Sequence, residues 1–186
     1  MKIIRYADLQ ALLWKNGGGV TREIARKEVG GEIEWRLSIA DVAAEGPFSA
    51  FPGMQRILTV IDGPGMLLDR PNLQALAANL FEPVAFAGDE PINGLLPHGP
   101  CRDFNVIWNP EFASASVTVA KGQPNQDIKR TGGNIGILCL AGNVQLSGGN
   151  GLALFDFALL NTNDESASLA NDSIALIICI TSVSKA

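Results

Sequence analysis

Three basic side chains stand in segments that are otherwise apolar or rich in glycine. Arg36 alternates with Trp35 and Leu37, Arg56 opens an apolar run, and Lys15 comes shortly before three consecutive glycines. A guanidinium group can hold a carboxylate through two parallel hydrogen bonds. If the arginines point inward they need partners, because an unpaired buried charge is very costly. Alternation does not tell which strand face is interior, so the alternative is that both arginines lie in solvent.

Polar side chains in neighbouring segments complete a candidate anion site. The backbone amides of Gly17, Gly18 and Gly19 can converge on an anion, although a flexible turn explains the same run. Asp103 and Asn105 share one strand face, where they could orient the arginines, bind an amine or form an exposed edge. The predicted ligand-binding residues are Lys15, Asn16, Thr21, Glu23, Arg36, Arg56, Asp103 and Asn105.

The residue types exclude several other kinds of site. The chain has one histidine, His98, so a metal site built on two or three imidazoles is impossible within it. The glycine run lacks the Gly-Lys-Ser/Thr ending of a P-loop, and Arg22 stands where a dinucleotide fingerprint needs glycine. We therefore predict no catalytic residue, no metal and no cofactor, and favour a protein that is not an enzyme. The alternative is acid–base catalysis through His98 or Tyr6.

Composition limits the class of protein and its partners. The 186 residues are 47% hydrophobic and 18% charged, with a formal net charge of −5. A chain of this size buries about 70% of its unfolded surface, so its core needs no disulfide or metal. The negative charge argues against a nucleic-acid partner. No apolar run is long enough to span a membrane. Three widely spaced cysteines without a CxxC pair indicate a cytoplasmic protein.

Alternation with a period of two dominates the chain and predicts an all-β fold with little helix. Turn-forming residues such as those of 62–65 and 148–151 separate the apolar runs, as in a β-sandwich or barrel. A two-turn helix is expected only at 7–14. The expected strands are 33–40, 56–61, 66–68, 84–86, 104–108, 116–119, 135–140, 144–146, 152–157 and 173–180.

One segment of the chain has a weak internal echo. The run 56–63, RILTVIDG, resembles 135–142, IGILCLAG, and each is followed by another short strand. Two copies of one small β-barrel explain this repetition, and chance similarity between short hairpins is the alternative. We expect an N-terminal barrel at 1–120, which carries the motifs, and a C-terminal half at 121–186.

Several ordered motifs make the chain similar to the HutD/Ves family. They are WKNGGGVTREI at 14–24, WRLSIADV at 35–42, GPFSAFPG at 46–53, FAGD at 86–89 and GPCRDFN at 99–105. The resemblance implies a bicupin fold, in which two jelly-roll β-barrels pack as one unit. It also implies a link to histidine degradation, because family members are often encoded with the enzymes of that pathway. The strand that delivers metal ligands in metal-dependent cupins reads FPGMQR at 51–56, which has no ligand cluster.

These observations predict a metal-independent, non-catalytic protein that binds a small carboxylate metabolite and modulates histidine catabolism. Urocanate and formiminoglutamate fit, since each has a carboxylate and a nitrogen group. One alternative is a metal-independent cupin enzyme with isomerase- or epimerase-like acid–base chemistry. Another is a structural or interaction module. A homodimer is a further expectation, because jelly rolls can pair their sheet edges.

Overall fold

The computed structural model describes residues 1–122, 127–129, 133–160 and 165–183. The described chain is built from antiparallel β-sheets, which confirms the all-β prediction. Within the described ranges the helical structure consists of one 3-10 turn, η1 (Tyr6–Asp8), so none of it is long enough to cross a membrane. The chain divides into a first unit, Gln10–Ala113, and a second unit, Met1–Leu9 with Ser114–Ala186.

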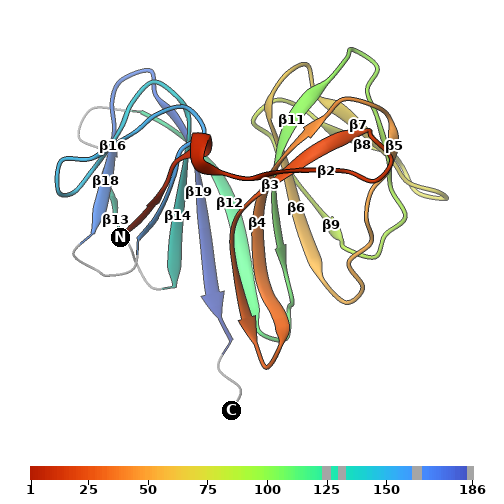
Figure 1. Ribbon diagram of the computed structural model, residues 1–186, viewed down its shortest axis with the longest axis horizontal. Helices are drawn as coiled ribbons and strands as arrows, with labels where there is room; N and C mark the ends of the chain where they lie inside the picture. Colours follow the sequence, from red (N-terminus) through yellow and green to blue (C-terminus); the bar gives the residue numbers. More distant parts are fainter. Residues whose placement is uncertain (123–126, 130–132, 161–164, 184–186) are drawn as a thin grey trace. The chain divides into compact units, whose positions relative to one another are not determined.

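The first unit contains two sheets whose inner faces share one core (Figure 1). Its apolar residues come from both sheets, as in Leu58 and Leu68, which are fully buried. The larger sheet has the order β2 (Ala11–Leu13), β3 (Gly19–Val29), β4 (Glu32–Val42), β11 (Cys101–Trp108), β6 (Gln55–Asp62) and β9 (Pro83–Ala87). The smaller sheet has the order β5 (Gly46–Pro47), β10 (Asn93–Leu95), β7 (Met66–Asp69) and β8 (Leu76–Ala78).

The second unit also contains two sheets. One has the order β1 (Lys2–Ile4), β17 (Phe157–Leu160), β14 (Asn134–Ala141), β19 (Ile174–Ser182) and β12 (Ala113–Lys121). The other has the order β13 (Asp127–Lys129), β18 (Ser166–Leu169), β15 (Val144–Leu146) and β16 (Gly151–Leu152). The division therefore differs from a boundary at 120/121, because β1 and β12 are both hydrogen-bonded into a sheet of the second unit.

The two units repeat one strand order. The run β4-β11-β6-β9 matches β12-β19-β14-β17, and β5-β10-β7-β8 matches β13-β18-β15-β16. Details repeat as well: Phe81 and Phe155 have left-handed backbones, with φ of 62° and 63°. Their amides donate to the carbonyl oxygens of Val60 and Cys139, each at 2.8 Å. The echo between 56–63 and 135–142 is therefore a repeat of structure, which chance hairpin similarity does not explain.

Two local expectations are wrong, and one strand was missed. Residues 7–14 form no two-turn helix: β2 pairs instead with β3, and Leu12 and Leu13 are exposed, so no apolar helical face is available to bury. The expected strand 152–157 is interrupted, because the left-handed backbone of Phe155 separates β16 from β17. The long strand β3 was not among the expected strands, since its outer positions are polar and mask the alternation.

Candidate functional site

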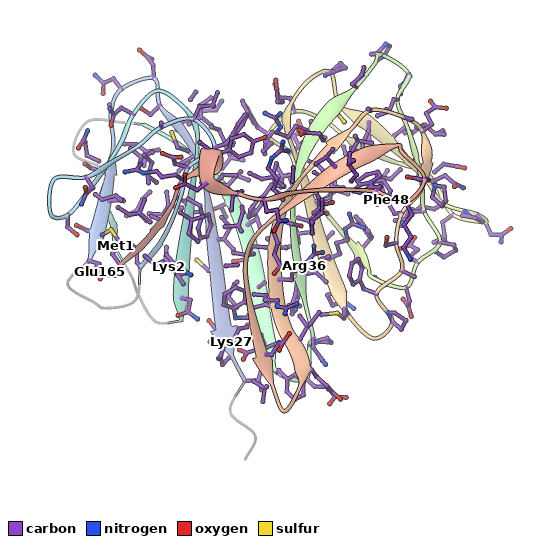
Figure 2. All side chains as sticks on the ribbon, in the orientation of Figure 1. Met1, Lys2, Lys27, Arg36, Phe48 and Glu165 are labelled. Carbon is purple, nitrogen blue, oxygen red and sulfur yellow. The ribbon has the colours of Figure 1, made fainter. Side chains whose placement is uncertain are left out.

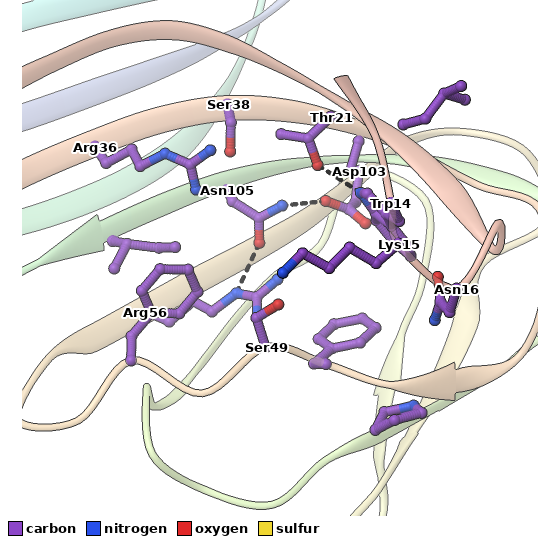
Figure 3. A pocket seen from close by; sticks show the side chains of 16 residues that line it. Trp14, Lys15, Asn16, Thr21, Arg36, Ser38, Ser49, Arg56, Asp103 and Asn105 are labelled. Carbon is purple, nitrogen blue, oxygen red and sulfur yellow. Dashed lines mark hydrogen bonds between the residues drawn. The ribbon is translucent and has the colours of Figure 1, made fainter. Parts of the chain in front are cut away.

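The first unit contains a cavity of about 570 Å³. This volume lies in the range of small-molecule pockets, about 300–1,000 Å³. Figure 3 shows side chains converging on it from β4, β6, β11 and the segments before β3 and after β5. The lining combines an apolar wall with a few polar groups and consists of Leu13, Trp14, Lys15, Asn16, Thr21, Arg36, Ser38, Ala40, Pro47, Phe48, Ser49, Phe51, Arg56, Asp103, Asn105 and Ile107.

Strand β4 presents Arg36 to this cavity. Ser38 lies on the same strand face and also lines the cavity, whereas Leu37, on the opposite face, is fully buried. The ambiguity of the alternating pattern is thereby resolved for this strand. The Nε of Arg36 donates to Glu23 Oε2 on β3 at 2.8 Å. Glu23 itself does not line the cavity; it holds the arginine that does. Figure 2 labels Arg36 on its strand.

Arg56 is the most enclosed cation of the site, with 8% of its surface exposed. Its Nε donates to Asn105 Oδ1 at 2.8 Å. Its guanidinium carbon lies 4.7 Å from the ring centroid of Phe48 and 5.3 Å from that of Phe86, within cation–π range. Burial lowers the pKa of Arg56 to about 10, partly offset by the attraction of Asp103. The group is therefore still a cation at neutral pH.

Asn105 connects Arg56 to a buried carboxyl group. Its Nδ2 donates to Asp103 Oδ1, while its Oδ1 accepts from Arg56 (Figure 3). Asp103 is 1% exposed and makes no direct ion pair with Arg56. Burial raises the pKa of Asp103 to about 7, although the charge of Arg56 and the hydrogen bond from Asn105 oppose this rise. As expected, Asp103 and Asn105 share a strand face, and that face lines the cavity.

The glycine run does not supply the amides expected of it. The N–H of Gly17 donates to the carbonyl of Trp14 at 3.0 Å, and the N–H of Gly18 donates to Asn16 Oδ1 at 3.0 Å. Both amides are therefore used to close the turn between β2 and β3. Gly19 is required for close packing, since a Cβ atom there would lie 2.5 Å from the carbonyl oxygen of Asp41.

The same turn contributes side chains instead. Lys15 extends from it into the cavity toward Arg56 (Figure 3). Trp14 forms part of the wall and donates from Nε1 to Thr21 Oγ1 at 2.7 Å. The lining then holds three cationic side chains, those of Lys15, Arg36 and Arg56, against one carboxyl group. This imbalance favours an anionic ligand.

Seven of the eight residues expected from the sequence line the cavity, and Glu23 lies directly behind Arg36. Sequence reasoning missed the aromatic wall of Trp14, Phe48 and Phe51 as part of the site. All three stand within the motifs at 14–24 and 46–53, so their position beside the polar residues was a usable signal. Neither His98, which is exposed on a turn, nor Tyr6, which belongs to the second unit, lines the cavity.

In the second unit, apolar residues stand at the positions that correspond to Arg56, Asp103 and Asn105. The repeat pairs Arg56 with Ile135, and the register of the flanking strands then pairs Asp103 with Ala175 and Asn105 with Ile177. Ile135 and Ala175 are buried in the core of that unit, and Ile177 packs against it. The strand arrangement therefore needs none of the three polar side chains, which implies that they serve the cavity.

The cavity lining does not suit a metal ion. Metal-dependent cupins rely on a histidine and glutamate cluster, whereas Asp103 is the single His, Cys, Asp or Glu side chain of this lining. Three neighbouring cations would also repel a divalent ion. Across the described ranges, no group of three such side chains is placed to hold a metal.

Comparison with known proteins identifies relatives of the chain. The HutD family profile matches residues 6–177. An uncharacterised 21.2 kDa protein of the hutC 3′ region in Pseudomonas putida is 41% identical over 113 residues, a match that spans 60% of each chain. The structure of HutD from Pseudomonas fluorescens SBW25 (formate condition) is 33% identical, with a TM-score of 0.87 over 98% of this chain and 99% of the other.

A more distant likeness concerns the fold alone. A cupin 2 conserved barrel domain protein from Leptotrichia buccalis superposes with a TM-score of 0.61 over 98% of this chain and 96% of the other, at 12% identity. It agrees with the cupin architecture that the motifs imply. With a family match across most of its length and a 33% identical relative that it covers almost completely, the chain belongs to the HutD family.

Proposed function

We propose that the cavity of the first unit binds a small carboxylate metabolite, and that the protein acts in histidine catabolism as a binding protein. The observation that carries this proposal is the way in which Arg36 and Arg56 are held. Each arginine uses Nε for a hydrogen bond to a protein side chain, and neither has a further hydrogen-bond partner for its terminal nitrogens among the described residues. The terminal guanidinium nitrogens of both arginines therefore remain available to donate hydrogen bonds to a ligand in the cavity.

This arrangement suits a carboxylate for two reasons. A guanidinium fork matches the two oxygens of a carboxylate, and a site held rigidly beforehand loses less conformational entropy when its ligand binds. Lys15 adds a third positive charge at the same cavity. The aromatic wall, with Phe48 and Phe51, offers contact area for the organic part of the ligand.

The pathway assignment rests on family context. The Pseudomonas putida relative is named for the hutC 3′ region, and the Pseudomonas fluorescens HutD structure is described by a formate condition. Urocanate and formiminoglutamate are the candidate metabolites, because each joins a carboxylate to a nitrogen group within the size of the cavity.

Isothermal titration with these two metabolites tests the proposal. Arg56→Ile should weaken binding at least tenfold, because it removes a charged hydrogen-bond donor pair worth about 1.5–3 kcal/mol. Ile135 occupies the corresponding place in the second unit, so the variant places a residue that this strand arrangement accepts. Lys121→Gln, which removes an exposed positive charge in the second unit, is the matched control and should bind like the wild type. Equal affinities for all three proteins would refute the proposal.

A second candidate function follows from Asp103. A carboxyl group with a pKa near 7 is suited to general acid–base catalysis, and Asp103 is buried in the same cavity. An enzyme of this kind would turn over a bound carboxylate, and Asp103→Asn would abolish turnover while ligand binding continued. Stable metabolite after prolonged incubation with the wild type would eliminate this candidate and leave the binding protein.

A further inference from the structure

Asp103 accepts too few hydrogen bonds for a buried carboxylate. Its side chain is 1% exposed, and within the described residues it accepts a single hydrogen bond, from Asn105. An ionised carboxylate has about four acceptor sites. Neither Arg56 nor Lys15 lies close enough for an ion pair with it. The missing donor has to come from the contents of the cavity.

The fold does not require this buried acid. In the second unit Ala175 stands at the corresponding position and is fully buried in an apolar core. A carboxylate at Asp103 costs free energy that an alanine would not, because burial disfavours its charged form. Because the buried carboxylate of Asp103 destabilises the folded state and lines a cavity, its role is best explained by a ligand in that cavity.

The position of Asp103 relative to the arginines defines the shape of that ligand. Asn105 lies between Asp103 and Arg56, so the acid and the guanidinium occupy separate places in one cavity (Figure 3). A carboxylate bound to Arg56 leaves Asp103 open to a second part of the same molecule. An anion would be repelled by Asp103, whereas an N–H group would supply the donor that it lacks.

We infer that Asp103 is a specificity residue that selects ligands carrying an N–H donor in addition to the carboxylate held by the arginines. This inference rests on the proposed function. It names a ligand class with an anionic end and an N–H end, and it predicts discrimination against simple monocarboxylates. A site built to hydrogen-bond one substrate group rejects analogues that lack the group, because its own buried polar atom is then left unpaired.

A pair of probes that differ in one ring position tests the inference. 3-(1H-Pyrrol-2-yl)propanoate has a ring N–H, and 3-(furan-2-yl)propanoate has an oxygen in its place; neither ring titrates near neutral pH. Titration at pH 8, above the pKa of Asp103, keeps the acid ionised. The wild type should bind the pyrrole probe at least tenfold more tightly than the furan probe.

Two variants and one control separate recognition from structure. In Asp103→Ala the pyrrole preference should disappear, while the furan probe binds as tightly as before or more tightly, because a repelling charge is gone. Asp103→Asn keeps the shape and should retain only a reduced preference. Asp69→Ala removes an exposed carboxylate of the same unit and should keep the full preference.

The outcomes are distinct. Equal binding of both probes by the wild type, or a preference that survives in Asp103→Ala, overturns the inference and leaves carboxylate binding intact. If the wild type binds neither of the two probes and neither of the two candidate metabolites, the proposed function and the inference are both overturned.

Discussion

The buried acid makes the stability of the protein depend on pH in an unusual direction. The pKa of Asp103 rises from 3.8 to about 7 in the folded protein, chiefly through burial, which the charge of Arg56 and the hydrogen bond from Asn105 oppose. Between these two values the folded state binds more protons at this site than the unfolded state. Stability from this group is therefore complete below pH 3.8 and is lost as the pH rises through 7.

Burial sets most of the rise in the pKa of Asp103, and charges on two other strands modify it. Arg56 on β6 favours the ionised form, and Asp41 on β4 disfavours it. The rise of about three pKa units corresponds to a loss of about 4 kcal/mol in the free energy of unfolding, since each unit is worth about 1.4 kcal/mol.

Asp103→Asn is the perturbation that isolates this contribution. The amide cannot ionise, but its Oδ1 can still accept the hydrogen bond from Asn105. Urea unfolding of both proteins from pH 4 to pH 8 gives the two free-energy curves, and their difference cancels the other carboxylates. Between pH 4 and pH 8, the free energy of unfolding of the variant should rise by about 4 kcal/mol relative to that of the wild type. Parallel curves would refute the assignment of a buried, proton-binding acid at this position.

Three further predictions concern a close backbone approach, the cavity wall and a buried acid of the second unit. Gly19→Ala should lower the free energy of unfolding by more than about 2 kcal/mol in urea unfolding, because its Cβ would meet the carbonyl oxygen of Asp41; unchanged stability would contradict this close approach. Phe48→Leu removes one of the two rings that contact Arg56 and should weaken carboxylate binding about threefold in calorimetric titration. An unchanged affinity would show that this cation–π contact does not contribute to binding. Asp156→Ala should cost about 3 kcal/mol in thermal unfolding, since this buried acid accepts three hydrogen bonds, and a loss under 1 kcal/mol would show that they contribute little.

Much of the site was predictable from the sequence because its strands alternate strictly. The pattern around Arg36 placed Ser38 on the same face, and the pattern around Phe104 placed Asp103 beside Asn105. What alternation leaves undetermined is which face is interior, because both faces of β4 carry residues with little exposure. That question is decided by which strands pack opposite, and those strands lie far away along the chain.

Other features depend on contacts that no local pattern contains. The amides of the glycine run were expected to bind an anion, yet Asn16 caps one of them with its own side chain. The rings of Phe48 and Phe86 both contact Arg56, although Phe48 precedes it in the sequence and Phe86 follows it by 30 residues. The strand β3 escaped detection because its outer positions are polar. The partners of hydrogen bonds and the contacts of aromatic rings depend on the tertiary structure, so a local sequence pattern does not predict them.

The anchoring of the two guanidinium groups through Nε has a kinetic consequence. Because both arginines are held before the proposed ligand arrives, we expect its association rate to be governed by diffusion and by the local electric field rather than by a conformational change. For the proposed carboxylate ligand, added salt should therefore lower the association rate far more than it changes the dissociation rate, so that binding and release are both fast.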